Sequence, residues 1–160
     1  ALAGESQTRF LLASDAGYGF IVSLEELFSR NRAGKAVLTL PHGSQALPPL
    51  RVPPASDDAE VAVLSSNGNL LLFSLAELPQ MARGKGNKLI GIPAQRVRER
   101  QEIVVGLTVV PAGTKLQVVA GKSSKVLSGK QLEPFRAARG KRGALLPRGL
   151  RRAERLEAVE

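Results

Sequence analysis

The amino-acid sequence predicts an all-β protein made of about three propeller-like blades, each a sheet of four strands. The 160-residue chain repeats itself at intervals of about 50 residues. Each copy consists of short apolar runs separated by turn residues, which is typical of strands. Repeats of about 40 to 50 residues with four strands each are typical of propeller blades or of another all-β array. Solenoids of paired helices do not fit this pattern.

The repeat is visible when the sequence is aligned with itself. Phe10–Leu27 aligns without a gap with Val61–Leu78, at a shift of 51 residues. Gly34–Pro41 then aligns with Gly86–Pro93 at a shift of 52. In the third copy, Gly140–Pro147 continues this second block at a further shift of 54. We therefore treat the chain as a single domain over 1–160, with repeats at approximately 9–54, 60–111 and 114–160.

Each copy opens with a predicted β-hairpin. The apolar runs Val61–Ser65 and Leu70–Ser74 flank Ser66–Asn69, and Asp15–Gly17 occupies the same position in the first copy. Asn and Gly tolerate the positive φ that hairpin turns require. A hairpin is thus expected at the start of each repeat.

A short helical turn follows each hairpin, and two further strands complete the copy. Leu24–Leu27, Leu75–Leu78 and Gly129–Leu132 place apolar residues three apart, which suffices for one turn docked on a sheet. The Pro-rich stretch Leu47–Pro54 indicates an exposed connection between the first two copies.

The terminal segment Arg155–Glu160 has conflicting signals. Its Ala, Glu, Arg and Leu content favours helix, but the repeat aligns it with Gln101–Gly106, which is typical of a strand. Because sheet pairing in a repeat array overrides weak propensity, we predict a strand.

Composition excludes several classes of protein. The chain has no cysteine and a single histidine, His42, so disulfides, thiolate metal sites and histidine zinc clusters are excluded. No apolar run approaches the roughly 18 residues of a membrane helix. The sequence begins with Ala1 and lacks the features of a secretory signal, which indicates a piece of a longer chain. The absence of cysteine favours a cytoplasmic location.

Positive charge is the strongest compositional signal. There are 23 Lys+Arg against 14 Asp+Glu, giving a net charge of +9 and a pI near 10.7. Such a surface favours polyanions, above all nucleic acid. The basic residues cluster between the helical turn and the next strand of each copy, where neighbouring glycines let backbone N–H groups approach a phosphate. These candidate DNA-binding residues are Arg30, Arg32 and Lys35, then Arg83, Lys85 and Lys88, then Arg136, Arg139, Lys141 and Arg142.

A second basic band follows the next strand of copies two and three. It contains Arg96, Arg98 and Arg100, and then Arg148, Arg151, Arg152 and Arg155. This band either widens a DNA track, for which Arg148, Arg151 and Arg152 are candidates, or is a row of charge that protects a strand edge. With five Phe and one Tyr, the chain lacks the clustered aromatics that stack single-stranded bases, so duplex DNA is favoured.

Particular segments resemble a known family. Phe10–Pro41, Ala82–Leu89 and Ala138–Ala144, with Arg148–Arg152 near the end, look like the C-terminal domain of the topoisomerase IV A subunit and, more distantly, of the gyrase A subunit. The resemblance implies a β-pinwheel, of which about three blades would form a partial ring. It implies a basic perimeter that binds double-stranded DNA and guides strand passage in supercoil relaxation and decatenation. No loop matches fully the glutamine-led box of gyrase, which favours topoisomerase IV.

The same resemblance implies where the domain works. It would be a non-catalytic part of an ATP-dependent type II topoisomerase, with the rest of the A subunit and the B subunit as partners, at the bacterial nucleoid. No cofactor is expected in this domain, since ATP and Mg²⁺ would act through other domains. A gyrase DNA-wrapping domain, a basic RNA-binding β protein and a protein-docking propeller are the alternatives.

Several isolated signals are interpreted as structural. Tyr18 is expected to pack beside its turn rather than attack phosphate. Gly121–Ser123 resembles the end of a nucleotide-binding loop, but the glycine required five residues earlier is Leu116. Asp57, Asp58 and Glu60 are interpreted as linker residues rather than as a magnesium site. No catalytic residue and no metal site is therefore predicted.

A partial ring also predicts an exposed strand edge. The first copy begins near Thr8–Leu12 with an apolar strand that carries little charge beyond Arg9. Because exposed edges recruit partners, we expect another molecule to cover this first blade, or the blade to be poorly ordered. Arg98 and Arg100 are expected to protect another edge.

Overall fold

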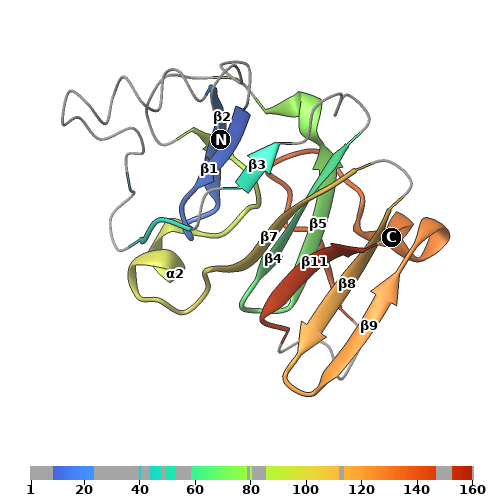
Figure 1. Ribbon diagram of the computed structural model, residues 1–160. Helices are drawn as coiled ribbons and strands as arrows, with labels where there is room; N and C mark the ends of the chain where they lie inside the picture. Colours follow the sequence, from blue (N-terminus) through green and yellow to red (C-terminus); the bar gives the residue numbers. More distant parts are fainter. Residues whose placement is uncertain are drawn as a thin grey trace.

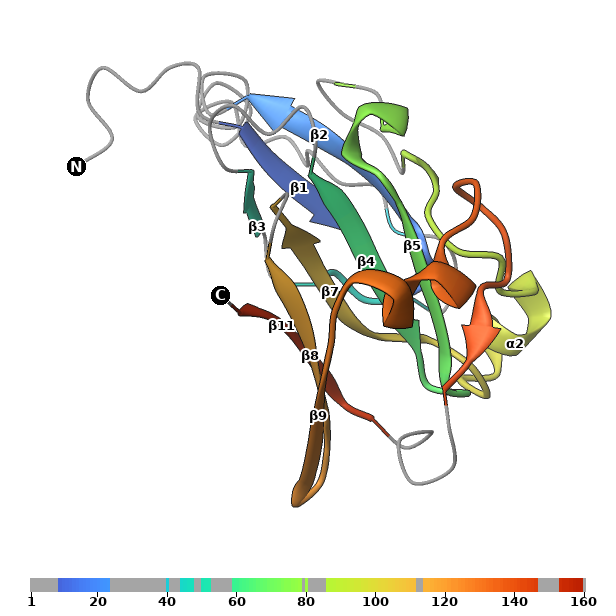
Figure 2. The ribbon, with the colours of Figure 1, turned by 90° about the vertical axis from the view of Figure 1, so that its right-hand side faces the viewer.

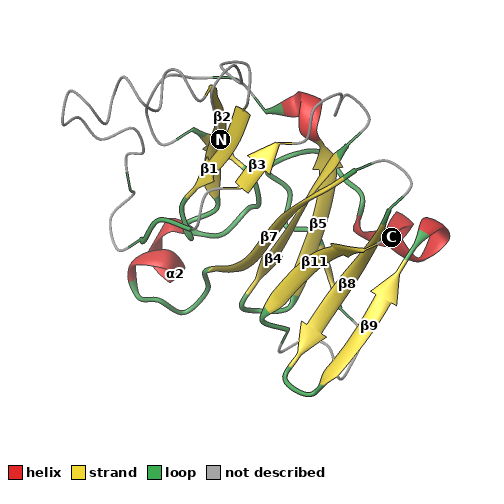
Figure 3. Ribbon diagram, in the orientation of Figure 1, coloured by secondary structure: helices red, strands yellow, loops and turns green. Residues whose placement is uncertain are grey.

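The computed structural model describes residues 9–23, 40, 44–47, 50–52, 59–78, 80, 86–111, 114–146 and 153–159. These residues form three antiparallel sheets and three short helical segments, so the predicted all-β class is confirmed. Strands dominate the fold, and the helical segments lie at its periphery (Figures 1 and 3).

The first sheet begins with the predicted hairpin. Strands β1 (Arg9–Ala13) and β2 (Tyr18–Ser23) pair around a turn in which Gly17 has a φ of 89°. Strand β3 (Leu50–Val52) pairs with the other side of β1, and β6 (Asn87–Lys88) pairs with β2. Because β3 covers β1, the open edge expected at the first strand is wrong. The exposed connection expected at Leu47–Pro54 is also wrong, because β3 and its buried Val52 lie within it.

The second sheet repeats this order, β10-β5-β4-β7. Its hairpin is β4 (Glu60–Ser65) and β5 (Asn69–Ser74), joined by the predicted Asn-Gly turn. Strand β7 (Val104–Val110) pairs with β4, and β10 (Ala144–Leu145) pairs with β5. The view in Figure 2 shows β4, β5 and β7 side by side in the middle of the molecule.

The third sheet has three strands in the described part of the chain. Strands β8 (Lys115–Ala120) and β9 (Ser123–Leu127) form the third hairpin, and β11 (Arg155–Val159) pairs with β8. The strand predicted for the terminal segment is thus confirmed over the residues described. Pairing with β8 supplies hydrogen-bond partners for the backbone N–H and C=O groups of β11. This pairing outweighs the local helix propensity of the segment.

Helical turns follow the second and third hairpins, as predicted. These are the 3₁₀ segments η1 (Leu75–Glu77) and η2 (Gly129–Phe135). Each begins with a capping box, in which Ser74 pairs with Glu77 and Ser128 with Gln131. The turn predicted at 24–27 lies outside the described residues.

One helix was not predicted. Segment α2 (Ala94–Arg98) follows Pro93, and it carries Arg96 and Arg98. The interpretation of this arginine run as a charged row on a strand is therefore wrong. Within α2, Val97 is the buried residue, at 3% exposed.

A strand from the following repeat completes each of the first two sheets. Strand β6 belongs to the second repeat but joins the first sheet, and β10 belongs to the third repeat but joins the second sheet. The repeats are consequently linked by exchanged strands, an arrangement that the sequence alignment does not reveal.

The structural register of the third repeat differs from the alignment by three residues. Gly86 (φ 83°) and Gly143 (φ 76°) occupy equivalent places, because a Cβ atom would meet Gly19 O at 2.1 Å and Leu70 O at 2.4 Å respectively. Their spacing is 57 residues, whereas the alignment pairs Gly86 with Gly140 at 54. The position must be glycine because the exchanged strand approaches the backbone of the preceding hairpin too closely to leave room for a Cβ atom.

The central sheet is buried on both faces. Val61, Val63 and the neighbouring Leu71 and Phe73 pack in one core cluster, with residues of the first sheet. The intervening positions of the same strands, such as Leu64, pack in a second cluster with η2 and the third sheet. Two-sided burial explains why β4 and β5 are continuous apolar runs rather than alternating ones.

Candidate nucleic-acid interface

Five of the candidate DNA-binding residues lie in the described part of the chain. They are Lys88, Arg136, Arg139, Lys141 and Arg142. The others lie outside the described residues: Arg30, Arg32, Lys35, Arg83, Lys85, Arg148, Arg151 and Arg152. The structure therefore describes the geometry of the candidate interface only at these five described residues.

The basic segments of the second and third repeats run side by side. Arg139 Nη1 donates a hydrogen bond to the carbonyl of Lys88 at 2.9 Å. Gly91 N–H donates to the carbonyl of Lys141 at 2.9 Å, and Arg142 Nη1 donates back to Gly91 O at 2.6 Å. Four basic residues from two successive repeats therefore lie close together, and backbone carbonyls hold the side chains of the two arginines.

The side chains of these four residues differ in their exposure and in their pairing within the protein. The side chains of Lys88 and Lys141 are exposed, and within the described residues neither has an ion-pair partner. Arg139 is half-buried, and its Nε is buried without a partner among the described residues. The two lysines are therefore the cations most available to an outside anion.

Arg142 is held by a buried carboxylate. Glu102 is fully buried, and its Oε1 accepts a hydrogen bond from Arg96 Nε at 3.1 Å. Its Oε2 lies 3.0 Å from Arg142 Nη1, an ion pair that lacks hydrogen-bond geometry. The Arg142 side chain remains 44% exposed. Glu102 thus ties α2 of the second repeat to the basic loop of the third.

A second ion pair ties the turn after α2 to the first hairpin. Asp15, in the hairpin turn, accepts a hydrogen bond from Arg100 Nη1 at 2.8 Å, and its other carboxylate oxygen accepts from Gln45 N–H at 2.9 Å. Arg100 adopts a φ of 57°, the one positive φ of a non-glycine residue in the described chain. Sequence reasoning missed Asp15 and Glu102. Glu102 closely follows Arg98 and Arg100 in the chain, which was an available signal. Asp15 is 85 residues from Arg100, so the sequence gives no such signal for it.

Arg136 lies apart from this group and is paired within the protein. Its Nε and Nη2 donate to the Glu60 carboxylate at 2.9 and 3.0 Å, and its Nη1 pairs with Glu133. The hydrogen bonds that the Arg136 guanidinium donates to the Glu60 carboxylate raise its pKa above the usual value. Glu60 is the first residue of β4, so its assignment to the linker is wrong; Asp57 and Asp58 lie outside the described residues.

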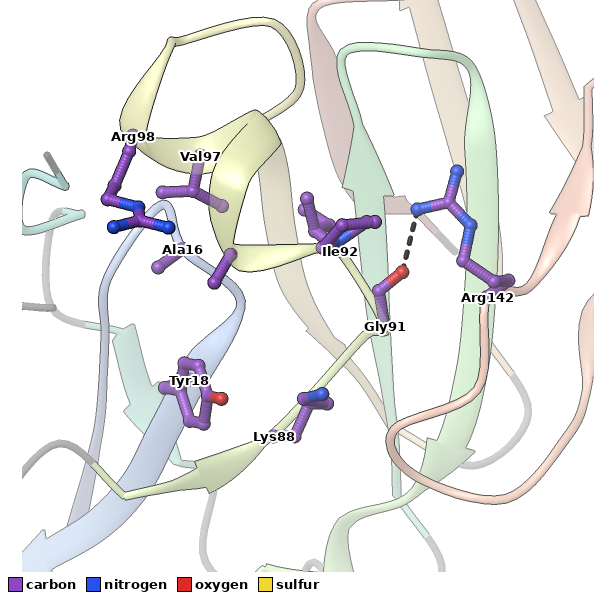
Figure 4. A pocket seen from close by; sticks show the side chains of 10 residues that line it. Ala16, Tyr18, Lys88, Gly91, Ile92, Val97, Arg98 and Arg142 are labelled. Carbon is purple, nitrogen blue, oxygen red and sulfur yellow. Dashed lines mark hydrogen bonds between the residues drawn. The ribbon is translucent and has the colours of Figure 1, made fainter. Parts of the chain in front are cut away.

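A pocket of about 640 Å³ opens beside the gathered cations (Figure 4). Tyr18 and Ala16 line it from the first hairpin, and Arg98 and Val97 line it from α2. Lys88, Arg142 and the stretch between Gly91 and Ala94 complete its wall. Tyr18 also packs against the first core cluster, as predicted.

The other isolated motifs have structural explanations. Gly121–Ser123 forms the turn of the β8–β9 hairpin, where Gly121 has a φ of 59°. Over the described residues there is no group of three His, Cys, Asp or Glu that could hold a metal ion. In the same part of the chain, no helix is long and apolar enough to span a membrane.

Comparison with known proteins gives concordant matches. The family model for the DNA gyrase C-terminal domain, a β-propeller, matches residues 8–43 and 59–111. The A subunit of DNA topoisomerase 4 from Pseudomonas aeruginosa is 48% identical over 92% of this chain, and that from Haemophilus influenzae is 42% identical over 90%. The chain spans only 19% of the length of each of these relatives.

Solved structures agree with the sequence comparison. The E. coli ParC C-terminal domain superposes with a TM-score of 0.84 at 38% identity, covering 94% of this chain and 60% of that one. The gyrase A C-terminal domain superposes with a TM-score of 0.64 at 15% identity, covering 97% of this chain and 47% of that one, which shows the shared fold. From its repeated hairpins, its exchanged strands and these matches, the chain belongs to the DNA gyrase C-terminal domain family of β-propellers, with marked similarity to topoisomerase 4 A subunits.

Proposed function

We propose that this chain is the duplex-DNA-binding part of a topoisomerase IV A subunit. The observation that carries the proposal is the junction of two successive repeats, where Lys88, Arg139, Lys141 and Arg142 lie close together and the two arginines bind backbone carbonyls. Repetition of one basic corner per repeat would give a band that follows a DNA backbone. Phosphate contacts of this kind position a duplex without reading its sequence.

The geometry ranks the candidate residues. Lys88 and Lys141 are exposed and unpaired within the described residues, so they are the proposed phosphate contacts. Arg142 is held by Glu102 and Arg139 by the Lys88 carbonyl, so their proposed role is to supply fixed positive charge near the lysines. Arg136 is paired with Glu60 and Glu133, and its proposed role is to fix the loop.

In the whole enzyme, the domain would hold DNA segments for strand passage during supercoil relaxation and decatenation. The B subunit, ATP and Mg²⁺ would act through other parts of the enzyme, in the bacterial cytoplasm at the nucleoid. Similarity to topoisomerase 4 A subunits supports this assignment over a gyrase wrapping domain.

Salt dependence of duplex binding tests the proposal. If about six phosphates are engaged, log affinity falls against log salt with a slope of roughly −5. Lys88→Gln with Lys141→Gln should lower affinity for all duplex sequences alike and make the slope shallower by about 2. The matched control is Lys122→Gln with Lys125→Gln, which removes the same charge from the β8–β9 hairpin.

Three results would contradict the proposal. A slope near −1 would exclude an extended band of contacts. An equal loss in the control pair would show that only net charge matters. Tighter binding to RNA than to duplex DNA would favour an RNA-binding protein.

A further inference from the structure

We propose that the pocket beside the basic junction is a binding site for a nucleotide, a ligand with a phosphate and an aromatic base. This inference goes beyond duplex binding through backbone phosphates, although Lys88 and Arg142 contribute to both surfaces. The pocket volume of about 640 Å³ lies within the ~300–1,000 Å³ range of small-molecule sites.

The charge of the pocket favours an anion. Among the described residues, three cations line it, Lys88, Arg98 and Arg142, and no carboxylate does. They come from β6, α2 and the loop of the third repeat. Arg98 and Lys88 have no ion-pair partner within the described chain, so their charges are uncompensated there. Lys and Arg that converge on a pocket form strong, charge-assisted hydrogen bonds with a phosphate.

The rest of the wall favours a ligand with an aromatic part. Ala16, Ile92 and Val97 are each no more than 4% exposed, and they form an apolar surface beside the cations. Figure 4 shows Tyr18 on the hairpin side of this surface, with the Arg98 guanidinium extending from α2 toward the hairpin. Tyrosine rings and arginine planes stack on bases, which a simple phosphate contact would not require.

The pocket is preformed by interactions already described. The Asp15–Arg100 ion pair joins the hairpin to the turn after α2, and Glu102 pairs with both Arg96 of α2 and Arg142. In addition, Leu89 N–H donates to Gly17 O at 2.6 Å. Because its walls are fixed before a ligand arrives, the pocket requires little ordering on binding.

Tyr18 provides a direct reporter, since it is the only tyrosine in the chain. Labelling with 3-fluorotyrosine gives one ¹⁹F resonance, located in the pocket. Titration with 5′-AMP should shift this resonance saturably, and adenosine or inorganic phosphate alone should bind more weakly. Arg98→Gln should weaken AMP binding by roughly tenfold or more. Arg98→Lys should restore part of the affinity, and Arg155→Gln, in the third sheet, should leave it unchanged.

The arms of the titration distinguish the source of the nucleotide. An AMP shift that Arg98→Gln removes supports a free nucleotide. No shift with AMP, but an Arg98-dependent shift with a short DNA strand, supports a nucleotide within DNA. Adenosine or phosphate acting as strongly as AMP, or no Arg98-dependent shift with any of these probes, overturns the proposal. Salt slopes of duplex binding, which depend on Lys88 and Lys141, test the proposed function separately.

Discussion

Replacing both Arg96 and Arg142, the two arginines that pair with Glu102, should lower the stability of the chain far more than replacing either one alone. Glu102 is fully buried, whereas Arg96 and Arg142 are 41% and 44% exposed. In Arg96→Gln or Arg142→Gln alone, the carboxylate keeps one cation. Each single substitution should therefore cost about 1 kcal/mol, in the range of half-exposed ion pairs. In the double variant, the carboxylate keeps none.

The magnitude follows from the difference in burial. A buried charge that loses its partners costs about 3–5 kcal/mol, because water cannot replace them. This is a large share of the ~5–15 kcal/mol by which domains are stable. At roughly 2–4 °C per kcal/mol for a domain of this size, the double variant should melt about 6–20 °C lower.

Thermal and urea unfolding followed by far-UV circular dichroism provide the measurement, since the chain has no tryptophan. Adding Glu102→Gln to the double variant should recover most of the loss, because the uncompensated charge is gone. Arg155→Gln serves as the exposed control. If the double variant loses only the sum of the single losses, or if the triple variant recovers nothing, the account of Glu102 as a buried, cation-dependent charge is refuted.

Three further predictions concern the fold and are measured as free energies of unfolding in urea, the third also by the salt slope of duplex binding. Gly143→Ala should cost about 2–3 kcal/mol, since its φ is 76° and a Cβ would lie 2.4 Å from Leu70 O. The control Gly121→Ala, with open space around the added Cβ, should cost about 1 kcal/mol. Equal costs would count against the close approach of Gly143 to Leu70. Leu64→Ala in the doubly buried strand should cost about 2–5 kcal/mol, but Leu145→Ala, 49% exposed, well under half of that. Arg136→Gln should lower stability by about 1 kcal/mol while leaving the salt slope of duplex binding unchanged. A slope shallower by about 1 would instead make Arg136 a phosphate contact.

The sequence predicts those features that local chemistry determines. The Gly17 and Gly68 turns and the strands around them follow from residues within a few positions of each other. The strand at Arg155–Val159 required the repeat as well, since its local propensity favours helix. Each of these predictions depends on a pattern that recurs in more than one copy.

The features that the sequence does not predict depend on distant partners. Gly140 and Gly143 are equally plausible by identity, and only the approach to Leu70 distinguishes them. The helix at Ala94–Arg98 occurs in one copy of the described chain, so the repeat gives no signal for it. Equally, nothing in the basic run around Arg136 shows that Glu60, 76 residues earlier, pairs with it.

The exchange of strands between repeats has a consequence for folding during synthesis. The first sheet cannot be completed until residues 87–88 have left the ribosome, and the second sheet must wait for residues 144–145. Until then, the free side of β2 or of β5 is exposed to other chains. Each newly made repeat therefore closes the one before it, and translation pauses between repeats would prolong the time during which an unpaired edge can meet the same edge on another nascent chain.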